Sequence, residues 1–154
     1  MAKLEFTTEI AAPADRVFVF FVPQRMPYWY GAEMESCLEV QEGAAEFRTG
    51  LKVRIAGRLR GKEVTHTAVV TAYQWGRLLE WRFQDAYGVR GRQRWELEPG
   101  RTEPAAPLTR VRMQDHYDLP GTLGRIADWL LTRHAVVRRD LADLARLKRL
   151  AERA

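Results

Sequence analysis

Hydrophobic and polar residues alternate along most of the first 117 residues, and a helical spacing replaces this alternation in the last quarter of the chain. Alternation puts successive side chains on opposite faces of an extended strand, so each alternating run predicts a strand with one buried face. In the first run, Leu4, Phe6 and Ile10 share a face. We therefore expect a half-buried strand at residues 4–10.

Six further alternating runs follow, most of them separated by short turns that contain glycine. Such turns between alternating runs are typical of antiparallel hairpins. In the run at 64–72, every even-numbered residue up to Ala72 is expected to face inward. The inward rows are expected at residues 34–40, 51–55, 64–72, 79–83, 89–97 and 111–117.

Two short helices are expected between the first and second strands. Pro13 suits the first position of a helix, where its missing N–H would have no partner, and Pro23 ends the same segment. A second short turn is expected at Pro27, with Gly31 at its exit.

Residues 122–153 have the spacing of one long amphipathic helix. A helix of ~30 residues is ~45 Å long, which is enough to cross a small domain. Asp143 and Arg146 fall off the apolar stripe and are expected to face solvent. The stripe comprises Leu123, Ile126, Ala127, Leu130, His134, Val137, Leu141, Leu144 and Ala145.

The expected helices are grouped rather than interleaved with the strands, which favours an α+β fold. We expect a curved seven-stranded antiparallel sheet wrapped around the long C-terminal helix, with two short helices between strands 1 and 2. A chain of 154 residues is long enough to form one buried core. We therefore expect a single domain over residues 1–154.

Similarity to a known family rests on four segments: residues 10–18 (IAAPADRVF), Trp29, residues 73–79 (YQWGRLL) and residues 140–148 (DLADLARLK). They resemble the START-like, or polyketide cyclase/dehydrase and lipid-transport, superfamily, also called SRPBCC proteins. The resemblance implies a helix-grip fold with an elongated cavity between the sheet and the C-terminal helix. The superfamily contains both carriers and enzymes, so the fold alone does not give the function.

The resemblance implies that the protein binds or carries a small hydrophobic molecule, such as a lipid, polyketide or quinone, in that cavity. The alternative is a polyketide cyclase/dehydratase-type enzyme that uses the same cavity. Small inward residues such as Ala68 and Gly91 either leave open space or let the helix approach closely. The residues expected to line the cavity are Trp81, Phe83, Gln93, Trp95, Met113, Tyr117, Leu130 and His134.

An enzyme would need an acid/base pair within reach of the ligand. The candidates are His66, Asp115 and His134, and strand order suggests that His66, Asp115 and Tyr117 are neighbours. Tyr117 and Gln93 would then orient a ligand oxygen. The same residues can instead be structural, because a buried His and Asp can bond to each other or to the backbone.

The sequence has a single cysteine, Cys37, and three histidines far apart. A disulfide framework and a cysteine-based zinc site are therefore excluded. Phosphate-binding loops and nucleophile-elbow motifs are also missing from the sequence. We expect no metal and no cofactor. No window approaches ~18 uninterrupted apolar residues, so we expect a cytoplasmic protein without a transmembrane segment.

The formal net charge is +5, and many of the basic residues fall on the outward face of the predicted sheet. The ordinary interpretation is a solvated face with cross-strand salt bridges. The alternative is a docking surface for RNA, the ribosome or an anionic membrane, although the missing aromatic residues argue against specific single-strand recognition. The outward basic residues are Lys52, Arg54, Arg82, Arg90, Arg92, Arg94, Arg110 and Arg112, interrupted by Glu80 and Glu96.

Overall fold

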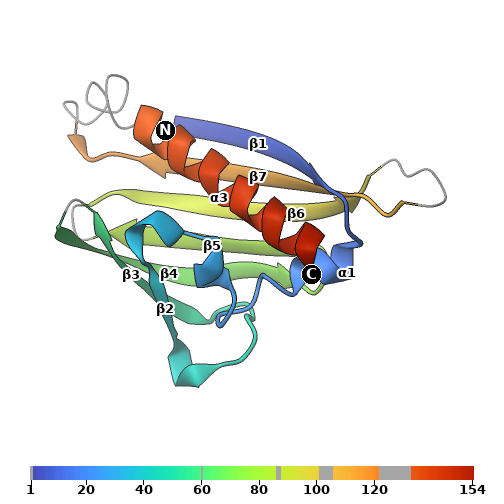
Figure 1. Ribbon diagram of the computed structural model, residues 1–154. Helices are drawn as coiled ribbons and strands as arrows, with labels where there is room; N and C mark the ends of the chain where they lie inside the picture. The colour runs from blue at the N-terminus through green and yellow to red at the C-terminus, as the bar shows by residue number, and fades with distance from the viewer. Residues whose placement is uncertain (1, 60, 86–87, 101–105, 122–132) are drawn as a thin grey trace.

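The computed structural model describes the chain except for residues 1, 60, 86–87, 101–105 and 122–132 (Figure 1). Its elements follow the predicted order of strand, short helices, further strands and a long helix. They are β1 Ala2–Ile10, α1 Ala14–Phe18, the 3-10 helices η1 Met26–Tyr28 and η2 Ala32–Met34, β2 Cys37–Val40, the 3-10 helix η3 Gln41–Gly43, β3 Lys52–Leu59, β4 Lys62–Gln74, β5 Leu78–Asp85, β6 Arg90–Pro99, β7 Thr109–Asp118 and α3 Arg133–Arg153.

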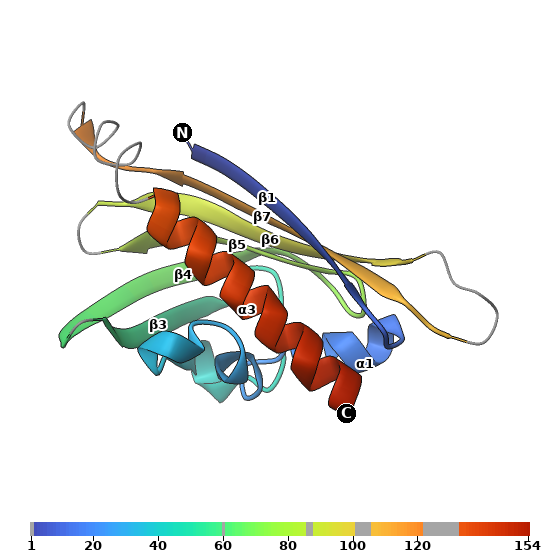
Figure 2. The same cartoon turned by 45° about the horizontal axis from the view of Figure 1, so that its top comes forward.

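The seven strands form one antiparallel sheet in the order β1-β7-β6-β5-β4-β3-β2. Strands β2 to β7 each lie beside their neighbours in sequence, whereas β1 pairs with the last strand, Ala2 opposite Tyr117 and Ile10 opposite Thr109. Helix α3 lies diagonally across one face of the curved sheet, and α1 lies near the C-terminal end of that helix (Figures 1 and 2). This arrangement confirms the predicted α+β helix-grip fold.

The buried side of α3 differs from the predicted stripe. Leu141 is 50% exposed, and His134 and Ala145 are also exposed, so their inward placement was wrong. The predicted stripe also included Leu123, Ile126, Ala127 and Leu130. These four residues belong to the segment 122–132, which lies outside the described residues. The inward positions of α3 recur at i, i+3, i+4, i+7 and i+11, and two of them are aspartates. They are Asp140, Asp143, Leu144, Leu147 and Ala151.

Strand β4 changes face near its end. After a register shift that follows Val70, Ala72 lies opposite Glu80, and Tyr73 lies opposite Leu79. A β-bulge adds one residue to one strand and so reverses the inward and outward positions beyond it. Ala72, which was expected to face inward, therefore belongs to the outer row, and Tyr73 turns toward the core.

Strand β2 begins at Cys37, later than the predicted row that started at Met34. Met34 instead ends the 3-10 helix η2, which follows Gly31 in the left-handed conformation (φ 61°). The hydroxyl of Ser36 donates to the backbone oxygen of Tyr30 at 2.8 Å. This turn holds Tyr30 against the inner face of the sheet.

Three tryptophans fill the centre of the core, and all are fully buried: Trp29, Trp81 and Trp95. The rings of Trp81 and Trp95 meet edge to face at 5.2 Å between centroids, and Tyr30 meets Trp81 in the same way at 5.6 Å. Large aromatic side chains dominate core energetics, and edge-to-face contacts add to that burial. The packed rings fix the position of the polar groups beside them.

Candidate functional site

A buried polar network lies on the inner face of the sheet, where β6 and β7 face α3. The structure places His66, Gln93, Asp115 and Tyr117 on this face. Gln93 and Asp115 are direct partners in the β6–β7 register and are 3% and 1% exposed. Polar groups buried to this extent must find partners inside the protein.

Gln93 is the centre of the network. Its Oε1 accepts hydrogen bonds from the Tyr30 hydroxyl at 2.7 Å and from Nε1 of Trp81 at 2.9 Å. Its Nε2 donates to Oδ2 of Asp115 at 3.4 Å. Because two donors point at Oε1, the amide can be oriented in only one way.

Helix α3 completes the network from the other side. A terminal nitrogen of Arg139 lies 3.3 Å from Oδ2 of Asp115 and 3.4 Å from Oδ1 of Asp140. Asp140 is fully buried, whereas the Arg139 side chain is 28% exposed. One guanidinium therefore links a carboxylate on the sheet to a carboxylate on the helix.

A second set of contacts anchors α3 to the turn after η1. Oδ1 of Asp143 accepts from the backbone N–H of Gly31 at 3.3 Å and from Arg146 at 3.1 Å. Arg146 also contacts Glu33 at 2.8 Å. We assign these contacts to positioning of the helix, because each of them joins α3 to the turn or to itself.

Burial changes the acidity of the helix carboxyls. Desolvation, the charge of Asp115 and a hydrogen bond with Asp115 raise the pKa of Asp140 to about 9. Desolvation also raises the pKa of Asp143 to about 6, although the Gly31 N–H and Arg139 favour its charged form. Asp140 is thus a neutral acid at pH 7 beside the carboxylate of Asp115.

Several polar atoms of this network have no hydrogen-bond partner in the described part of the chain: Oδ1 of Asp115, Oδ2 of Asp140 and Oδ2 of Asp143. A proton on Asp140 that is shared with Asp115 satisfies one oxygen of each. A carboxylate oxygen has two lone pairs, so Asp115 can still accept from another donor. The network therefore retains hydrogen-bonding capacity in an apolar surrounding.

His66 stands apart from the network. It lies on β4, and strands β5 and β6 separate it from Asp115 on β7. The expectation that His66 and Asp115 are neighbours was therefore wrong. Burial, and next the charge of Arg139, lower the pKa of His66, and its ring meets Phe83 edge to face at 5.8 Å. Its Nδ1 is buried without a partner among the described residues. His66 is therefore a neutral imidazole at the edge of the inner face.

Comparison with known protein families places the chain in one of them. The model of the family described as "Polyketide cyclase / dehydrase and lipid transport" matches residues 1–152. The chain belongs to this family. The predicted resemblance is thus confirmed over nearly the whole chain. No curated protein matches the sequence.

Solved structures share the family fold at low sequence identity. A protein from Chromobacterium violaceum is 15% identical with a TM-score of 0.69, and 99% of each chain is covered. Ara h 8.0201 is 11% identical with a TM-score of 0.69, again with 99% of each chain covered. DynU16, from the dynemicin biosynthetic locus, is 21% identical with a TM-score of 0.63, over 97% of this chain and 47% of that chain. These similarities show the fold.

The remaining predicted lining residues fall into different environments. Trp81, Trp95 and Met113 are buried in the core, Tyr117 is 3% exposed in a smaller cluster with Ala2 and Leu4, and Phe83 is half-buried. His134 is exposed on α3 and does not join the network. Leu130 lies outside the described residues.

Sequence analysis missed four members of the network: Tyr30, Arg139, Asp140 and Asp143. Tyr30 lies in a turn, where no periodicity marks its direction. Asp143 was expected to face solvent because it falls off the apolar stripe, and Asp140 was assigned to neither side of the helix. Both aspartates lie at helical spacing from Leu144 and Leu147. This spacing was the signal in the sequence that could have placed them on the buried side of the helix.

The described residues contain no group of three or more His, Cys, Asp or Glu side chains arranged to hold a metal ion. None of the described helices is long and apolar enough to cross a membrane. The polar groups of the inner network are the donors Tyr30, Gln93 and Arg139 and the carboxyl groups of Asp115 and Asp140.

Proposed function

We propose that the protein binds a small hydrophobic molecule between the inner face of the sheet and α3. We further propose that a hydroxyl group of the ligand donates a hydrogen bond to the Asp115 carboxylate. Membership of a family of cyclases, dehydrases and lipid-transport proteins supports binding of a hydrophobic ligand. The buried polar network supports the second part.

The observation that carries this proposal is the free hydrogen-bonding capacity of the Asp115 carboxylate. Asp115 is 1% exposed, and its Oδ1 has no hydrogen-bond partner in the described chain. The proton shared with Asp140 leaves lone pairs on the Asp115 carboxylate, so a ligand hydroxyl could donate to it. The side chains of Trp81 and Trp95, packed beside the network, make its surroundings apolar. Ligand sites typically combine such a surface with a few fixed polar groups.

The charges of the network favour a neutral ligand. Arg139, the cation that contacts Asp115 within the described part of the chain, also contacts Asp140. A ligand carboxylate would meet Asp115 without a cation free to compensate it, and like charges at short range repel strongly in a buried site. We therefore expect phenols or alcohols to bind more tightly than fatty acids of similar size.

A second candidate function is an enzyme of the cyclase or dehydratase type. It is favoured by one observation, the pKa of Asp140 at about 9 beside a carboxylate on β7. A buried carboxyl group with a raised pKa can act as a general acid near neutral pH. In this role, Asp140 would give a proton to a ligand carbonyl and Asp115 would accept one from the ligand.

The proposal can be tested by calorimetric titration with paired ligands of similar size, one phenolic and one carboxylic, against the parent and the Asp115→Asn variant. We expect the phenol to bind more tightly to the parent. Loss of the carboxylate should weaken phenol binding roughly 10- to 100-fold, since a hydrogen bond to a charged group contributes ~1.5–3 kcal/mol. Asp118→Asn, an exposed change on the same strand, is the control and should leave affinity within about twofold.

Three outcomes would contradict the proposal: no binding by any compound, tighter binding of the carboxylic partner, or unchanged affinity in Asp115→Asn at unchanged melting temperature. Mass spectrometry of each compound after incubation separates the two functions. A product of altered mass with the parent, and none with Asp140→Asn, would establish the enzyme.

A further inference from the structure

The outer face of the sheet contains one row of side chains with four cations and no acid. We call it the basic row. The strand registers place its members opposite one another across six strands. It consists of Lys3 on β1, His116 on β7, Arg92 on β6, Arg82 on β5, Val69 on β4 and Lys52 on β3.

The rows on either side contain acids as well as bases. In one of them, Arg94 lies 2.8 Å from Glu80 on the adjacent strand. In the other, Arg54 lies 3.2 Å from Glu39. Basic residues on this sheet are thus generally matched by acids from neighbouring strands. The basic row is an exception to that rule.

Arg82 and Arg92 lie directly opposite each other across β5 and β6. Like charges in this position destabilise an antiparallel pair. Arg92 contacts Nδ1 of His116 at 3.1 Å and lies 3.9 Å from Glu80, which already bonds Arg94 more closely. Within the described chain, Arg82 forms no ion pair with an acid. Fold stability therefore gives no reason for this pair of arginines.

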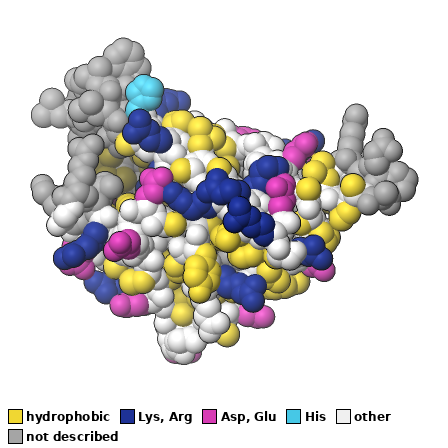
Figure 3. All heavy atoms as spheres, in the orientation of Figure 1, with side chains coloured by type: hydrophobic (Ala, Val, Ile, Leu, Met, Phe, Trp, Pro, Cys, Tyr) yellow, Lys and Arg dark blue, Asp and Glu magenta, His cyan; other side chains and the backbone are white. Residues whose placement is uncertain are grey.

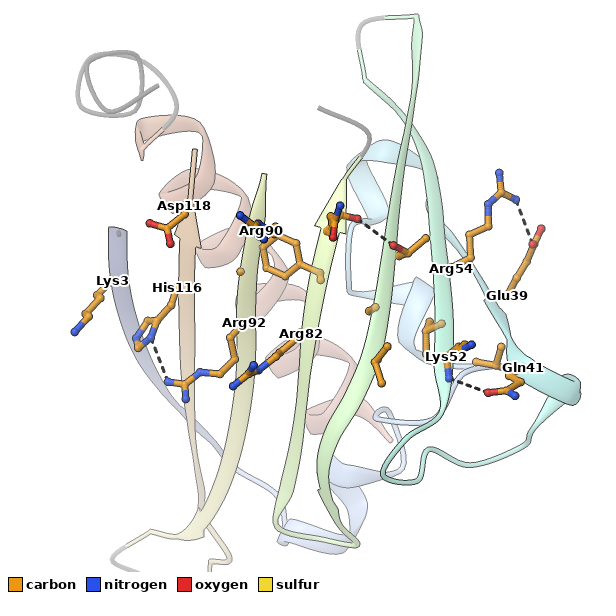
Figure 4. Close-up of a pocket in the computed structure, with 18 residues that line it drawn as sticks. Lys3, Glu39, Gln41, Lys52, Arg54, Arg82, Arg90, Arg92, His116 and Asp118 are labelled. Atoms are coloured by element: carbon orange, nitrogen blue, oxygen red, sulfur yellow. Dashed lines mark hydrogen bonds and ion pairs between the residues drawn. The ribbon is translucent and has the colours of Figure 1, made fainter. Parts of the chain in front are cut away.

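The basic row lines a trough of about 1080 Å³ on the face of the sheet opposite α3, together with residues of the neighbouring row that include the acids Glu39 and Asp118 (Figure 4). Lys3 and Lys52 lie toward its two ends, and Arg92 and Arg82 lie between them. Val69 also lines the trough and is 41% exposed. Five strand spacings of ~4.8 Å give the row a length of about 24 Å.

We propose that this trough docks an acidic α-helix of a partner protein. About 16 residues of helix span 24 Å, and acids at i and i+4 lie ~5–6 Å apart, close to the strand spacing. The arginines can hold carboxylates in bidentate pairs, and Val69 offers one apolar contact. The proposal concerns the face opposite the interior network and does not depend on the proposed ligand.

Two other anionic partners fit the trough less well. A bilayer surface is flat on this scale, whereas the cations of the basic row line a hollow. Single-stranded nucleic acid is held largely by bases stacked on aromatic side chains. Among the described residues that line the trough, the aromatic rings are those of Phe83, which faces inward on β5 and meets His66, and His116, which contacts Arg92. This described lining contains no row of exposed Phe, Tyr or Trp rings on which successive bases could stack.

The experiment measures binding of a fluorescent 18-residue helical peptide with glutamates on one face and one central leucine, by anisotropy in 50 mM salt. A peptide of the same composition with glutamates all around the helix is the sequence control. The double variant Arg82→Gln/Arg92→Gln removes the centre of the basic row. Arg110→Gln/Arg112→Gln removes the same charge from two arginines on the same face that are paired with acids, and it is the matched control.

We expect the one-faced peptide to bind at least fivefold more tightly than its control. Arg82→Gln/Arg92→Gln should weaken binding at least tenfold and Arg110→Gln/Arg112→Gln at most twofold. The first double variant should melt no lower than the parent, because it removes a like-charge pair. Equal losses in both variants, or no peptide binding, would overturn the proposal. Tighter binding of a 12-residue oligouridylate or of vesicles with 30% phosphatidylserine would also overturn it.

Discussion

The two faces of one sheet use polar residues in opposite ways. On the inner face, Asp140 is fully buried, and desolvation is the largest cause of its raised pKa. On the outer face, desolvation also raises the pKa of Glu80, but hydrogen bonds from Arg94 and Thr71 outweigh it, so the pKa of Glu80 is lowered. Access to solvent and to cations decides which protonation state a carboxyl group takes in this fold.

This difference in burial gives the two faces of the sheet different sensitivities to substitution. A buried network with few partners has fixed geometry, so a change in one member alters stability, acidity and ligand binding together. Exposed ion pairs contribute little to stability, so the outer face can change its charge at small cost. The surface of the molecule on the side where α3 lies shows basic, acidic and hydrophobic side chains intermixed (Figure 3), whereas the basic row of the trough on the opposite side has its cations aligned.

The largest effect is expected from removal of most of α3, the helix that covers the inner face of the sheet. Deletion of residues 136–154 should abolish cooperative unfolding, because it exposes the sheet and removes the buried Leu144 and Leu147. Each large apolar side chain contributes ~1.5–3 kcal/mol, against a typical net stability of ~5–15 kcal/mol. The deletion also leaves Asp115 without Arg139. Circular dichroism during heating measures the result, and a cooperative melt near that of the parent would show that α3 is peripheral.

The next largest effect is expected from Arg139→Met, which leaves the inner carboxyls without their cation. Removing one partner of a buried ion pair costs ~3–5 kcal/mol, and the partial exposure of Arg139 reduces the expected loss to roughly 2–4 kcal/mol. The control Arg110→Met on the outer face should cost less than ~1 kcal/mol. Urea denaturation measures both. Similar losses in the two variants would show that burial does not distinguish the faces.

The inner face should also make stability depend on pH. The folded protein keeps a proton on Asp140 up to about pH 9, whereas in the unfolded chain this side chain has the ordinary aspartate pKa of 3.8. Stability should therefore fall as pH rises from about 4 to about 9. Between pH 7 and pH 9 we expect a loss of roughly 2–3 kcal/mol, at ~1.4 kcal/mol per pH unit, and a decrease in melting temperature on the order of 5–10 °C. In Asp140→Asn the decrease should be smaller, and an unchanged slope would mean that another group is responsible.

The fold could be predicted because its determinants repeat along the chain. Alternation and turn glycines gave the strands, their antiparallel order and the inward direction of Gln93 and Asp115. The single bulge after Val70 was not visible, because Ala72 and Tyr73 are both compatible with either face. One such residue reverses every later position in a strand.

The candidate site could be predicted only on its sheet side. Strand parity is strict, so Gln93 and Asp115 could be placed without knowing their contacts. Asp140 and Asp143 could not, because a hydrophobic pattern treats aspartate as exposed and thereby shifted the helix stripe toward Leu141. Tyr30 depends on a turn conformation that no period encodes. The network therefore became visible only when helix, turn and sheet were brought together.

The smallest effect, and the sharpest test of the outer face, is the energy of one exposed ion pair. Arg110 contacts Glu9 at 3.2 Å, and the two side chains are 41% and 53% exposed. A double-mutant cycle with Arg110→Gln and Glu9→Gln should give a coupling of ~0.2–0.5 kcal/mol at low salt that vanishes in 0.5 M salt, because solvent and ions screen exposed charges. The same cycle on Arg94 and Glu80, whose side chains are 28% and 12% exposed, should give about 1 kcal/mol with a weaker salt dependence. A larger coupling energy for Arg110 and Glu9 than for Arg94 and Glu80 would show that burial does not determine the strength of ion pairs on this sheet.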